Sequence, residues 1–349
     1  MRNALTYARR FAADFPTTLV AGDGNGFFRE EAEAGPFDLS ILAERAPRHS
    51  RFTGALRLRR WLRRQPPGVL VSMGVHGHPT VFLAAQGLPH IRRIYRISNE
   101  VAGAVKGDGW LRRLWLRLLM RDAARLVLVG RAMTGHRIFA HALKNGLATA
   151  IPNGVDAPLA RQQARAPAPH PWLAQDIPVV LAVGRLRPQK NLDLLIAAVA
   201  RARQSRRLRL IIIGEGSADE QARMRTLADM FAEDFLLAGE TDNVFAWMAR
   251  AAVLALPSRW EGSALVLLEA MAVGTPVIAS RLAGDAAAVL DEGRYGLLFD
   301  GTDREALAQA LLRQTSGLRV LPGNRADDYS IDRTSDRYAE VVAEVLRAG

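Results

Sequence analysis

The sequence lacks several features that define whole classes of protein. It has no cysteine among 349 residues, which excludes disulfides and thiolate metal sites. No apolar run reaches the roughly 18 residues that a membrane-spanning helix needs. The first ten residues lack the apolar core of a signal peptide. We therefore expect a cytoplasmic protein, either free or attached peripherally to the inner face of the cytoplasmic membrane.

Acidic residues are scarce in the first half of the chain. Residues 1–150 contain 24 Lys and Arg against 10 Asp and Glu, whereas the remainder contains 23 against 25. The whole excess behind the net charge of +12 therefore lies in the first half. Such an asymmetry indicates an anionic partner for that half: a membrane, a nucleic acid or a phosphorylated acceptor. A solvated, arginine-rich surface is the alternative.

Strand-like apolar runs alternate with helical stretches, which is typical of parallel sheets covered on both faces. The expected strands of the first half are Thr17–Ala21, Val69–Met73, Ile91–Ile97 and Leu126–Val129. Those of the second half are Val179–Val183, Leu208–Ile213, Phe235–Leu237, Val253–Leu256, Pro276–Ala279 and Gly296–Leu298. Helices are expected at Asn191–Gln204, Asp219–Asp229, Asp303–Leu312 and Arg333–Arg347.

Length and the spacing of prolines predict two domains. The first spans residues 1–156, a proline-rich linker spans 157–177, the second domain spans 178–330, and a terminal helix spans 331–349. A doubly wound domain normally opens with a buried strand and a tight turn, but this chain opens with a helix-like segment at Arg2–Ala13. We therefore expect the first strand and its loop to be absent from the first domain.

Two basic residues follow the first strand of the second half. The chain leaves that strand through Gly184, and a helix begins near Asn191, a favourable cap residue. Between them lie Arg185, a planar donor fork, and Lys190, a mobile point charge, which together suit two adjacent phosphate groups. An ordinary basic surface loop is the alternative.

Two further strands end in segments that suit a ligand. Gly214 and Glu215 follow a buried strand, and glycine there permits close approach of a ligand. After a later strand, a helix is expected to begin near Gly262–Ser263, so that free backbone N–H groups at its start would receive phosphate oxygens. The residues of that start are Gly262, Ser263, Ala264 and Leu265.

Two carboxylates flank this helix start. Glu261 precedes it and Glu269 lies within it, which would let one carboxylate meet a sugar while the other binds a ribose. A carboxylate in a run as apolar as the one around Glu269 needs a partner, so a structural acid is the alternative at that position.

Together these segments resemble the retaining glycosyltransferases of family 4. The resemblance rests on I-P-N-G-V-D at Ile151–Asp156, G-R-L…Q-K-N at Gly184–Asn191 and I-I-G-E-G at Ile212–Gly216. It rests above all on E-G-S-A-L-V-L-L-E-A-M-A-V-G-T-P-V-I-A-S at Glu261–Ser280. The resemblance implies an α/β fold of the GT-B type. Two doubly wound, Rossmann-like domains would face an interdomain cleft, and the C-terminal helix would cross back to the first domain.

The resemblance also implies roles for individual residues. Arg185 and Lys190 would bind the donor diphosphate, Glu261 would contact the transferred sugar, and these three would be the catalytic residues. Glu269 would bind the ribose, and the turn Gly262–Leu265 would hold phosphate near Gly184, Gly214 and Glu215. Asn153 and Gly154 would lie in a turn facing the cleft.

The implied reaction is sugar transfer from a nucleoside diphosphate sugar, with UDP-sugar favoured over GDP-sugar, to a glycan or lipid-linked saccharide of the polysaccharide or lipopolysaccharide type. Configuration at the anomeric carbon would be retained. We expect no cofactor and no metal, because Arg185, Lys190 and a helix dipole would neutralise the leaving diphosphate. The sequence has no D-x-D pair or His/Asp cluster with ligand spacing.

Candidate contacts to the acceptor or the sugar lie in the first half. His76 and His78 follow the C-terminal end of a predicted strand, where a loop histidine capping nearby backbone is the alternative. Ser98 or Asn99 stands where many members of the family carry a histidine near the sugar.

Arginine-rich stretches supply the charge of the first half. Eight arginines lie in Arg45–Arg64, and four more lie in the helical segment Trp110–Arg121. In that segment Leu111, Leu114, Trp115, Leu118 and Leu119 share one helical face. We favour a helix that covers the sheet with this face over one that lies in a membrane interface. Its arginines remain available to anionic lipid in either case.

Other functions compete with glycosyl transfer. A sugar-nucleotide epimerase or a glycan phosphorylase would share the fold, but neither explains the Glu261–Glu269 segment as well. A nucleic-acid binder would suit the high pI, yet the chain has no recognisable binding module and no aromatics interleaved with its arginines. We therefore expect no nucleic-acid partner. An inactive or N-terminally truncated relative is a further alternative.

Overall fold

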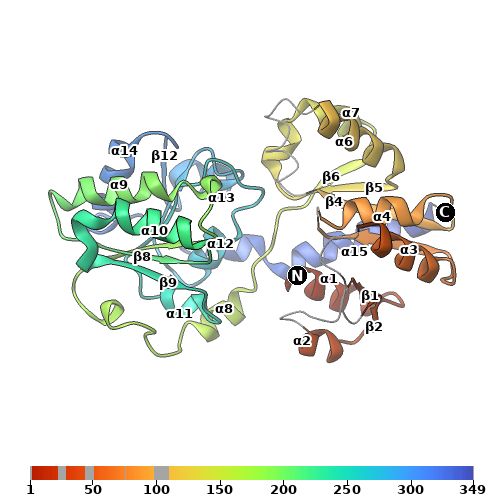
Figure 1. Ribbon diagram of the computed structural model, residues 1–349, viewed down its shortest axis with the longest axis horizontal. Coiled ribbons are helices and arrows are strands. Elements are labelled where there is room, and N and C mark those ends of the chain that lie inside the picture. Colours follow the sequence, from red (N-terminus) through yellow and green to blue (C-terminus); the bar gives the residue numbers. More distant parts are fainter. Residues whose placement is uncertain (1, 23–28, 44–50, 75, 98–109, 349) are drawn as a thin grey trace. The chain divides into compact units, whose positions relative to one another are not determined.

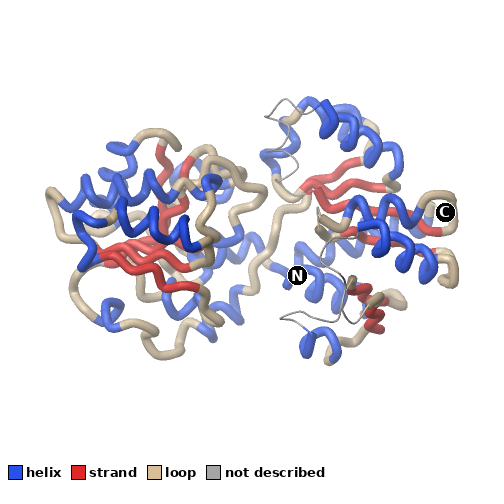
Figure 2. Tube along the Cα trace, in the orientation of Figure 1, coloured by secondary structure: helices blue, strands red, loops and turns tan. Residues whose placement is uncertain are grey.

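The computed structural model describes residues 2–22, 29–43, 51–74, 76–97 and 110–348. These residues form two compact units, each with its own parallel sheet (Figures 1 and 2). Unit 1 contains Met1–Pro152 together with Asp332–Gly349, and unit 2 contains Asn153–Ile331. Within the described ranges, no helix is both long and apolar enough to cross a lipid bilayer.

Unit 1 is built on a four-stranded parallel sheet in the order β3-β4-β5-β6. Its strands are β3 (Gly68–Ser72), β4 (Ile91–Ile97), β5 (Arg125–Leu128) and β6 (Ala148–Ala150). The strand expected at Thr17–Ala21 is observed as β1 (Thr18–Ala21), which pairs with β2 (Asp38–Ile41) in a separate parallel pair. Neither β2 nor β6 was predicted, because both are short and carry too few apolar residues to show a pattern of alternation.

Helices cover both faces of the unit 1 sheet. The helices of this unit are α1 (Arg2–Ala12), α2 (Arg29–Glu33), α3 (Arg51–Leu62), α4 (His78–Ala85), α6 (Trp110–Asp122), α7 (Ala140–Lys144) and α15 (Ile331–Arg347). Successive residues of a strand point to opposite faces. On β4, Tyr95 and Ile97 accordingly join the core beneath α3, α4 and α6, whereas Arg92 donates to the carbonyls of Val345 and Ala348 around the end of α15.

Unit 2 is built on a six-stranded parallel sheet in the order β12-β11-β10-β7-β8-β9. Its strands are β7 (Val179–Val183), β8 (Arg209–Ile213), β9 (Phe235–Gly239), β10 (Val253–Leu256), β11 (Val277–Ser280) and β12 (Leu297–Phe299). All six were predicted within two residues. The near-continuous apolar runs of these strands reflect burial on both faces, which is typical of a doubly wound sheet.

Two hydrophobic cores sandwich the unit 2 sheet. One face packs against α9 (Leu192–Arg203), α10 (Ala218–Leu227) and α14 (Arg304–Gln314). The other packs against α8 (Ala157–Gln163), α11 (Val244–Met248), α12 (Leu265–Ala272) and α13 (Ala286–Val289). Neighbouring residues alternate between the cores, so that Val180 faces the first group and Leu181 the second.

The segment predicted as a linker, 157–177, is instead part of unit 2. Its first residues form α8, whose Ala157 and Ala160 are buried in the core, and the side chain of Asp156 caps this helix. Two of the prolines that suggested a linker stand in first turns: Pro158 lies in the first turn of α8, and Pro171 opens a short 3-10 helix. A proline there loses no hydrogen bond, so these two mark helix starts, whereas Pro167 and Pro169 lie in the irregular stretch between the two helices.

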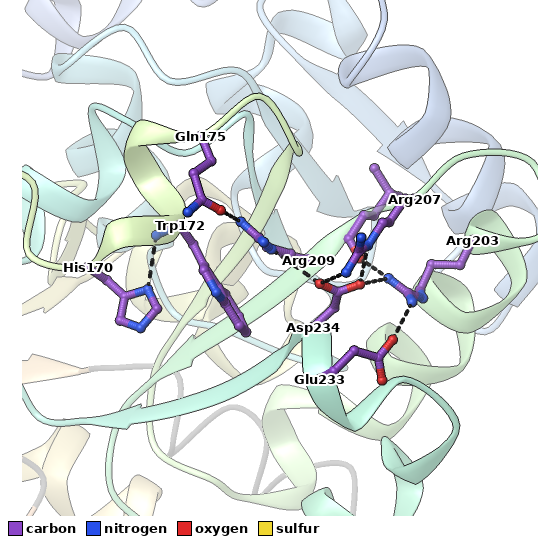
Figure 3. Close-up of polar contacts among 9 residues, drawn as sticks. His170, Trp172, Gln175, Arg203, Arg207, Arg209, Glu233 and Asp234 are labelled. Atoms are coloured by element: carbon purple, nitrogen blue, oxygen red, sulfur yellow. Dashed lines mark hydrogen bonds and ion pairs between the residues drawn. The ribbon is translucent and has the colours of Figure 1, made fainter.

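A buried carboxylate ties the beginnings of β8 and β9 together (Figure 3). Asp234 is fully buried and accepts from Arg203 at 2.7 Å, Arg207 at 2.7 Å and Arg209 at 3.2 Å. Arg209 also lies over the ring of Trp172, 4.8 Å from its centroid. Burial alone would raise the pKa of Asp234, but the hydrogen bonds from Arg207, Arg203 and Arg209 outweigh it and lower that pKa to about 2.

Replacing this carboxylate should destabilise unit 2. We expect Asp234→Asn to lower the free energy of unfolding by about 3 kcal/mol at neutral pH, because Arg209 would keep its charge in a buried place. Because the folded pKa lies below the unfolded one, this contribution is present above about pH 4 and is lost as the pH falls toward 2. Urea unfolding followed by circular dichroism at several pH values measures both effects.

The matched control is Glu233→Gln. Glu233 pairs with Arg203 alone among the described residues and its side chain is 64% exposed, so its loss should change stability by no more than about 0.5 kcal/mol. Equal effects of the two substitutions would contradict the assignment of the buried network to Asp234.

Candidate functional site

The order of the unit 2 strands creates a place for a ligand. The chain builds β7, β8 and β9 in one direction, and then β10 returns to pair with the other side of β7. In open parallel sheets, ligands bind at the carboxyl ends of the strands where the strand order reverses. The loops after β7 and β10 leave the sheet at this reversal. They contain two segments that the sequence singled out, Gly184–Asn191 and Glu261–Leu265.

An ion pair joins these two loops. Lys190 Nζ donates to Glu261 Oε1 at 2.7 Å, and both side chains are largely buried, with 20% and 11% of their surface exposed. The same carboxylate oxygen accepts from Ser258 Oγ at 2.6 Å. Ser258 is fully buried directly after β10. The structure therefore brings two of the three predicted catalytic residues into contact, and the Ser258 hydroxyl holds the carboxylate in place.

Gly184 provides the space for the lysine. It has a φ of +148°, and a Cβ there would lie 2.8 Å from Cε of Lys190. Gly214, at the end of β8, packs against the Gly184 carbonyl in turn, since a Cβ on Gly214 would lie 2.1 Å from that oxygen. Both predicted glycines thus serve close packing around Lys190, with the backbone of one against the other.

Further hydrogen bonds lock the loop after β7 to the loop after β10. Gln189 donates its side-chain amide to the Trp260 carbonyl at 2.9 Å, and its own carbonyl accepts from the backbone N–H of Arg259 at 2.9 Å. Asn191 adopts a left-handed conformation, with φ 53° and ψ 38°, which asparagine tolerates better than most residues. Its side chain accepts from Arg259 and donates to the Gly301 carbonyl.

Asn191 therefore differs from its predicted role. It stands at the N-cap position of α9, but its side chain makes no capping hydrogen bond to that helix. The side chain is used instead to connect the loops after β7, β10 and β12.

A pocket opens at the carboxyl ends of β7 and β8, where the loops after these strands begin. It has a volume of about 810 Å³, and its lining includes Arg185, Arg187, Glu215 and Ser217. Ser217 caps α10 and exchanges hydrogen bonds with Glu220 in a capping box. Two predicted donor-binding residues, Arg185 and Glu215, thus share one concave surface next to Gly184.

The helix that follows Glu261 begins slightly later than predicted. α12 starts at Leu265 with Ala264 at its N-cap, so Gly262 and Ser263 belong to the preceding turn. Leu267 and Leu268 donate to the Ala264 carbonyl, which establishes the first turn. Glu269 lies one turn further along α12 and is half-buried. The predicted order of turn, helix start and second carboxylate is therefore present, with the start shifted by two to three residues.

The candidate residues of unit 1 have different environments. His78 is fully buried; its Nδ1 lies 2.7 Å from Ser72 Oγ and its Nε2 lies 3.2 Å from the Arg96 carbonyl. Burial lowers its pKa to about 4, which keeps the ring neutral at physiological pH. His78 is therefore a structural residue of the unit 1 core rather than a ligand contact. This environment favours the alternative given for His78, a histidine bonded to nearby groups of the protein, over a contact to acceptor or sugar.

The roles of the other candidates, like those of the residues in unit 2, remain predictions. His76 lies in an exposed turn after β3. Ser98 and Asn99 lie outside the described residues. Asn153 and Gly154 are buried at the start of unit 2, next to Val155, which bridges to Ser330. Within the described residues, no group of three or more His, Asp and Glu is arranged to hold a metal ion.

Comparison with known families identifies the segment that carries this site. Residues 177–316 match the family described as glycosyl transferases group 1. We refer to residues 177–316 as the group 1 segment because of this match. They include both loops of the ion pair, the lining of the pocket, and the whole of α12.

Curated relatives match over parts of their length. The chain is 40% identical over 98 residues to a D-inositol 3-phosphate glycosyltransferase of Corynebacterium urealyticum, which covers 28% of this chain and 23% of the relative. It is 33% identical over 146 residues to a GDP-mannose-dependent alpha-(1-6)-phosphatidylinositol monomannoside mannosyltransferase of Mycolicibacterium smegmatis, covering 39% and 38%. The chain thus spans less than half the length of either relative.

Solved structures extend the likeness to both units of the fold. Anabaena Alr3699/HepE, solved with UDP and glucose, superposes with a TM-score of 0.78 at 18% identity and covers 98% of this chain and 95% of that one. A glycosyltransferase from Rickettsia africae superposes with a TM-score of 0.76 at 14% identity, covering 100% and 95%. The predicted α/β GT-B fold with two Rossmann-like units is confirmed.

Sequence reasoning missed several residues that shape the group 1 segment. Ser258 carries no signal beyond its place after a strand, and Gln189 none beyond its place beside Lys190. Gly284 was also missed: it has a φ of +58°, and a Cβ there would lie 2.5 Å from the Glu261 carbonyl oxygen. These residues come from loops far apart in sequence, so only the folded sheet shows that they meet.

A methyl group at Gly284 should displace the loop that carries Glu261. We expect Gly284→Ala to lower the affinity for inorganic pyrophosphate by about tenfold, because the shift of Glu261 also moves Lys190. Gly274→Ala is the matched control, since Gly274 has a φ of +81° but nothing within 4 Å of its Cβ position. Both substitutions carry a similar backbone penalty of about 1 kcal/mol.

Calorimetric titration of pyrophosphate into the two variants measures the difference. If Gly284→Ala and Gly274→Ala bind pyrophosphate equally well, the close contact with Glu261 has no influence on the site.

Proposed function

We propose that this chain is a retaining glycosyltransferase, of the class EC 2.4, that moves a sugar from a nucleoside diphosphate sugar to a saccharide acceptor. The observation that carries the proposal is the Lys190–Glu261 ion pair at the strand-order reversal, inside the group 1 segment. A cation and a carboxylate in contact there offer one group for a diphosphate and one for a sugar.

The diphosphate would be bound without a metal ion. Lys190 supplies a largely buried cation, Arg185 lines the pocket at the ends of β7 and β8, and α12 begins at Leu265, directly after the loop that carries Glu261. These groups together offset the negative charge that develops on the leaving diphosphate. A departing phosphate oxygen can then take the proton of the acceptor hydroxyl, so that the reaction needs no separate general base.

The two carboxylates would bind the remaining parts of the donor, the sugar and the ribose. Glu261, held by Ser258 and Lys190, would bind hydroxyl groups of the transferred sugar next to the diphosphate. Glu269, one turn into α12, would accept hydrogen bonds from the ribose hydroxyls. A carboxylate suits both tasks because it accepts two hydrogen bonds from vicinal hydroxyls.

For the nucleotide we favour UDP over GDP. The Anabaena structure, which contains UDP and glucose, supports this choice at the level of the fold, whereas the mycobacterial relative is named for GDP-mannose. For the acceptor we favour a lipid-linked saccharide of the polysaccharide or lipopolysaccharide type, used by a peripheral enzyme at the inner face of the cytoplasmic membrane. The positive charge of the first half of the chain supports an acceptor at an anionic surface.

Three variants separate the parts of the donor site. Lys190→Ala should weaken both pyrophosphate and UDP by about tenfold or more, since a charge-assisted hydrogen bond is lost. Glu269→Gln should weaken UDP but leave pyrophosphate unchanged, because pyrophosphate has no ribose. Glu261→Gln should bind UDP more tightly, since Lys190 is released from its carboxylate partner, while sugar transfer falls. Calorimetry without metal ions, with UDP, GDP, ADP and their common sugar conjugates, measures these affinities.

The controls are Lys144→Ala and Glu340→Gln, which change exposed residues of unit 1. Neither should alter the affinity for any nucleotide. A folded parent protein that binds none of these nucleotides or their sugars would argue against glycosyl transfer and favour an inactive relative. Formation of a new nucleotide sugar without any acceptor would favour an epimerase.

A further inference from the structure

The exposed apolar side chains of unit 1 are concentrated on one layer of helices. Of the eight exposed large hydrophobic residues described in this unit, seven lie on α3, α4 and α6. They are Phe52 and Leu56 on α3, Leu83 on α4, and Trp110, Leu111, Leu114 and Leu118 on α6. Four of them are more than half exposed: Phe52 at 76%, Trp110 at 64%, Leu111 at 61% and Leu56 at 57%.

These three helices belong to one continuous layer. Their buried residues share a single core on the same face of the sheet. α3 and α4 lie side by side (Figure 1), and Arg59 of α3 donates to the Ala84 carbonyl of α4. α4 and α6 meet through an edge-to-face contact between Phe82 and Trp115, with ring centroids 5.2 Å apart. The outward sides of all three helices therefore point away from the same sheet.

The rotation of α6 is set from its buried side. Leu116 and Leu119 enter the core. Asp122, in the last turn, accepts from Arg93 at 2.7 Å and from Tyr95 at 2.6 Å. Hydrogen bonds from Arg93 and Tyr95 lower the pKa of Asp122 although burial opposes them, so this anchor stays charged at neutral pH.

This rotation corrects the predicted buried face of α6. Leu111, Leu114 and Leu118 were expected to cover the sheet, but all three are exposed. The apolar band of the helix is wider than the surface it covers, so one edge of the band reaches the core and the other faces out. Exposed apolar residues gathered in this way on the helices of one layer indicate an interaction site.

Positive charge accompanies the apolar band. Arg113, Arg117 and Arg121 follow one another at four-residue intervals and so form a line along α6 beside the leucines. Arg60, Arg63 and Arg64 add exposed charges at the end of α3. The only acidic residue within α3, α4 and α6 is Asp122, which is held by Arg93. Among the described residues, these six arginines have no anionic partner.

We propose that this outward surface of α3, α4 and α6, here named the docking face, binds an anionic lipid bilayer. The leucines and Trp110 would enter the boundary between headgroups and acyl chains, while the arginines would bind lipid phosphates. A second copy of the chain would set arginine against arginine. A nucleic acid would neutralise the arginines but leave the leucines in water. An anionic bilayer matches both components.

The inference rests on the acceptor part of the proposed function, which places the chain at an anionic membrane, but it does not depend on the donor site, since the docking face contains none of the donor residues. It can hold if the chain binds no nucleotide, and it can fail while the donor site binds UDP normally. UDP affinity in every docking variant therefore shows which of the two proposals a result concerns.

Vesicle flotation of the full chain tests the proposal. The parent should float with vesicles of equal parts phosphatidylglycerol and phosphatidylethanolamine, and should remain behind with phosphatidylcholine vesicles. The triple variant Leu111→Gln, Leu114→Gln and Leu118→Gln should lose about a hundredfold in affinity. The triple variant Arg113→Gln, Arg117→Gln and Arg121→Gln should lose a similar factor, at about fivefold for each arginine.

The control changes exposed residues of the same types in unit 2. Leu318→Gln, Leu321→Gln and Arg319→Gln replace two leucines exposed at 79% and 56% and an exposed arginine, and flotation should not change. Circular dichroism of each variant establishes that the fold is kept. Equal binding of the parent to neutral and anionic vesicles would overturn the proposal. So would full flotation of both α6 variants, or a lipid-free dimer that dissociates in the leucine variant.

Trp110 provides a measurement that does not depend on weakened binding. Brominated acyl chains should quench the fluorescence of vesicle-bound parent protein, and Trp110→Phe should remove most of that quenching while flotation stays the same. Trp260→Phe, which changes an exposed tryptophan of unit 2, should leave the quenching intact. Quenching that persists in Trp110→Phe would place another surface in the bilayer and overturn the proposal.

Discussion

The return of β10 to the free side of β7 is the constraint on which the candidate site depends. This pairing brings the loop that carries Lys190 against the loop that carries Glu261, although 71 residues separate the two. Neither loop contains a long regular element of its own. Each is held by the strand before it and the helix after it, so the charges are positioned by the buried sheet rather than by the loops themselves.

Tight backbone packing turns this topology into a precise contact. Gly184 and Gly214 lie against one another at neighbouring strand ends, and Gly284 lies against the Glu261 carbonyl. Asn191 holds its left-handed turn with hydrogen bonds to two other loops. Glycines and a left-handed residue thus let the backbones pack closely enough to hold the lysine and the carboxylate in contact. The sheet brings the two loops together, and the glycines fix the distance between them.

How far the sequence could predict these features depended on the range of the interactions. The unit 2 strands are apolar throughout because both faces are buried, so each one can be recognised in the sequence by itself. The segments predicted to bind the donor come directly after these strands. Ser258 and Gly284 could not be found, since their roles arise from contacts between separate loops. Pro158 and Pro171 suggested a linker wrongly, because proline opens a helix or interrupts one according to its position.

The periodicity of apolar residues was also insufficient to predict the buried side of α6, for a different reason. A hydrophobic pattern shows which residues share a side of a helix, but not how much of that side the neighbouring sheet can cover. The anchors that decide the matter, Arg93 and Tyr95, lie on another strand. The apolar residues predicted to share one side of α6 do share it. Which of them are buried and which are exposed could be learned only from the folded structure.

The chain uses arginine in two opposite ways. In unit 2, Arg203, Arg207 and Arg209 converge on the fully buried Asp234. Their charges are paired with its carboxylate, and the ion pairs hold two strands together. On the docking face of unit 1, Arg113 and Arg117 stand beside exposed leucines with no carboxylate of α3, α4 or α6 to neutralise them. Composition counts these residues alike. Their partners distinguish them: the arginines around Asp234 are paired within the fold, whereas those of the docking face are left to the bilayer that we propose as their partner.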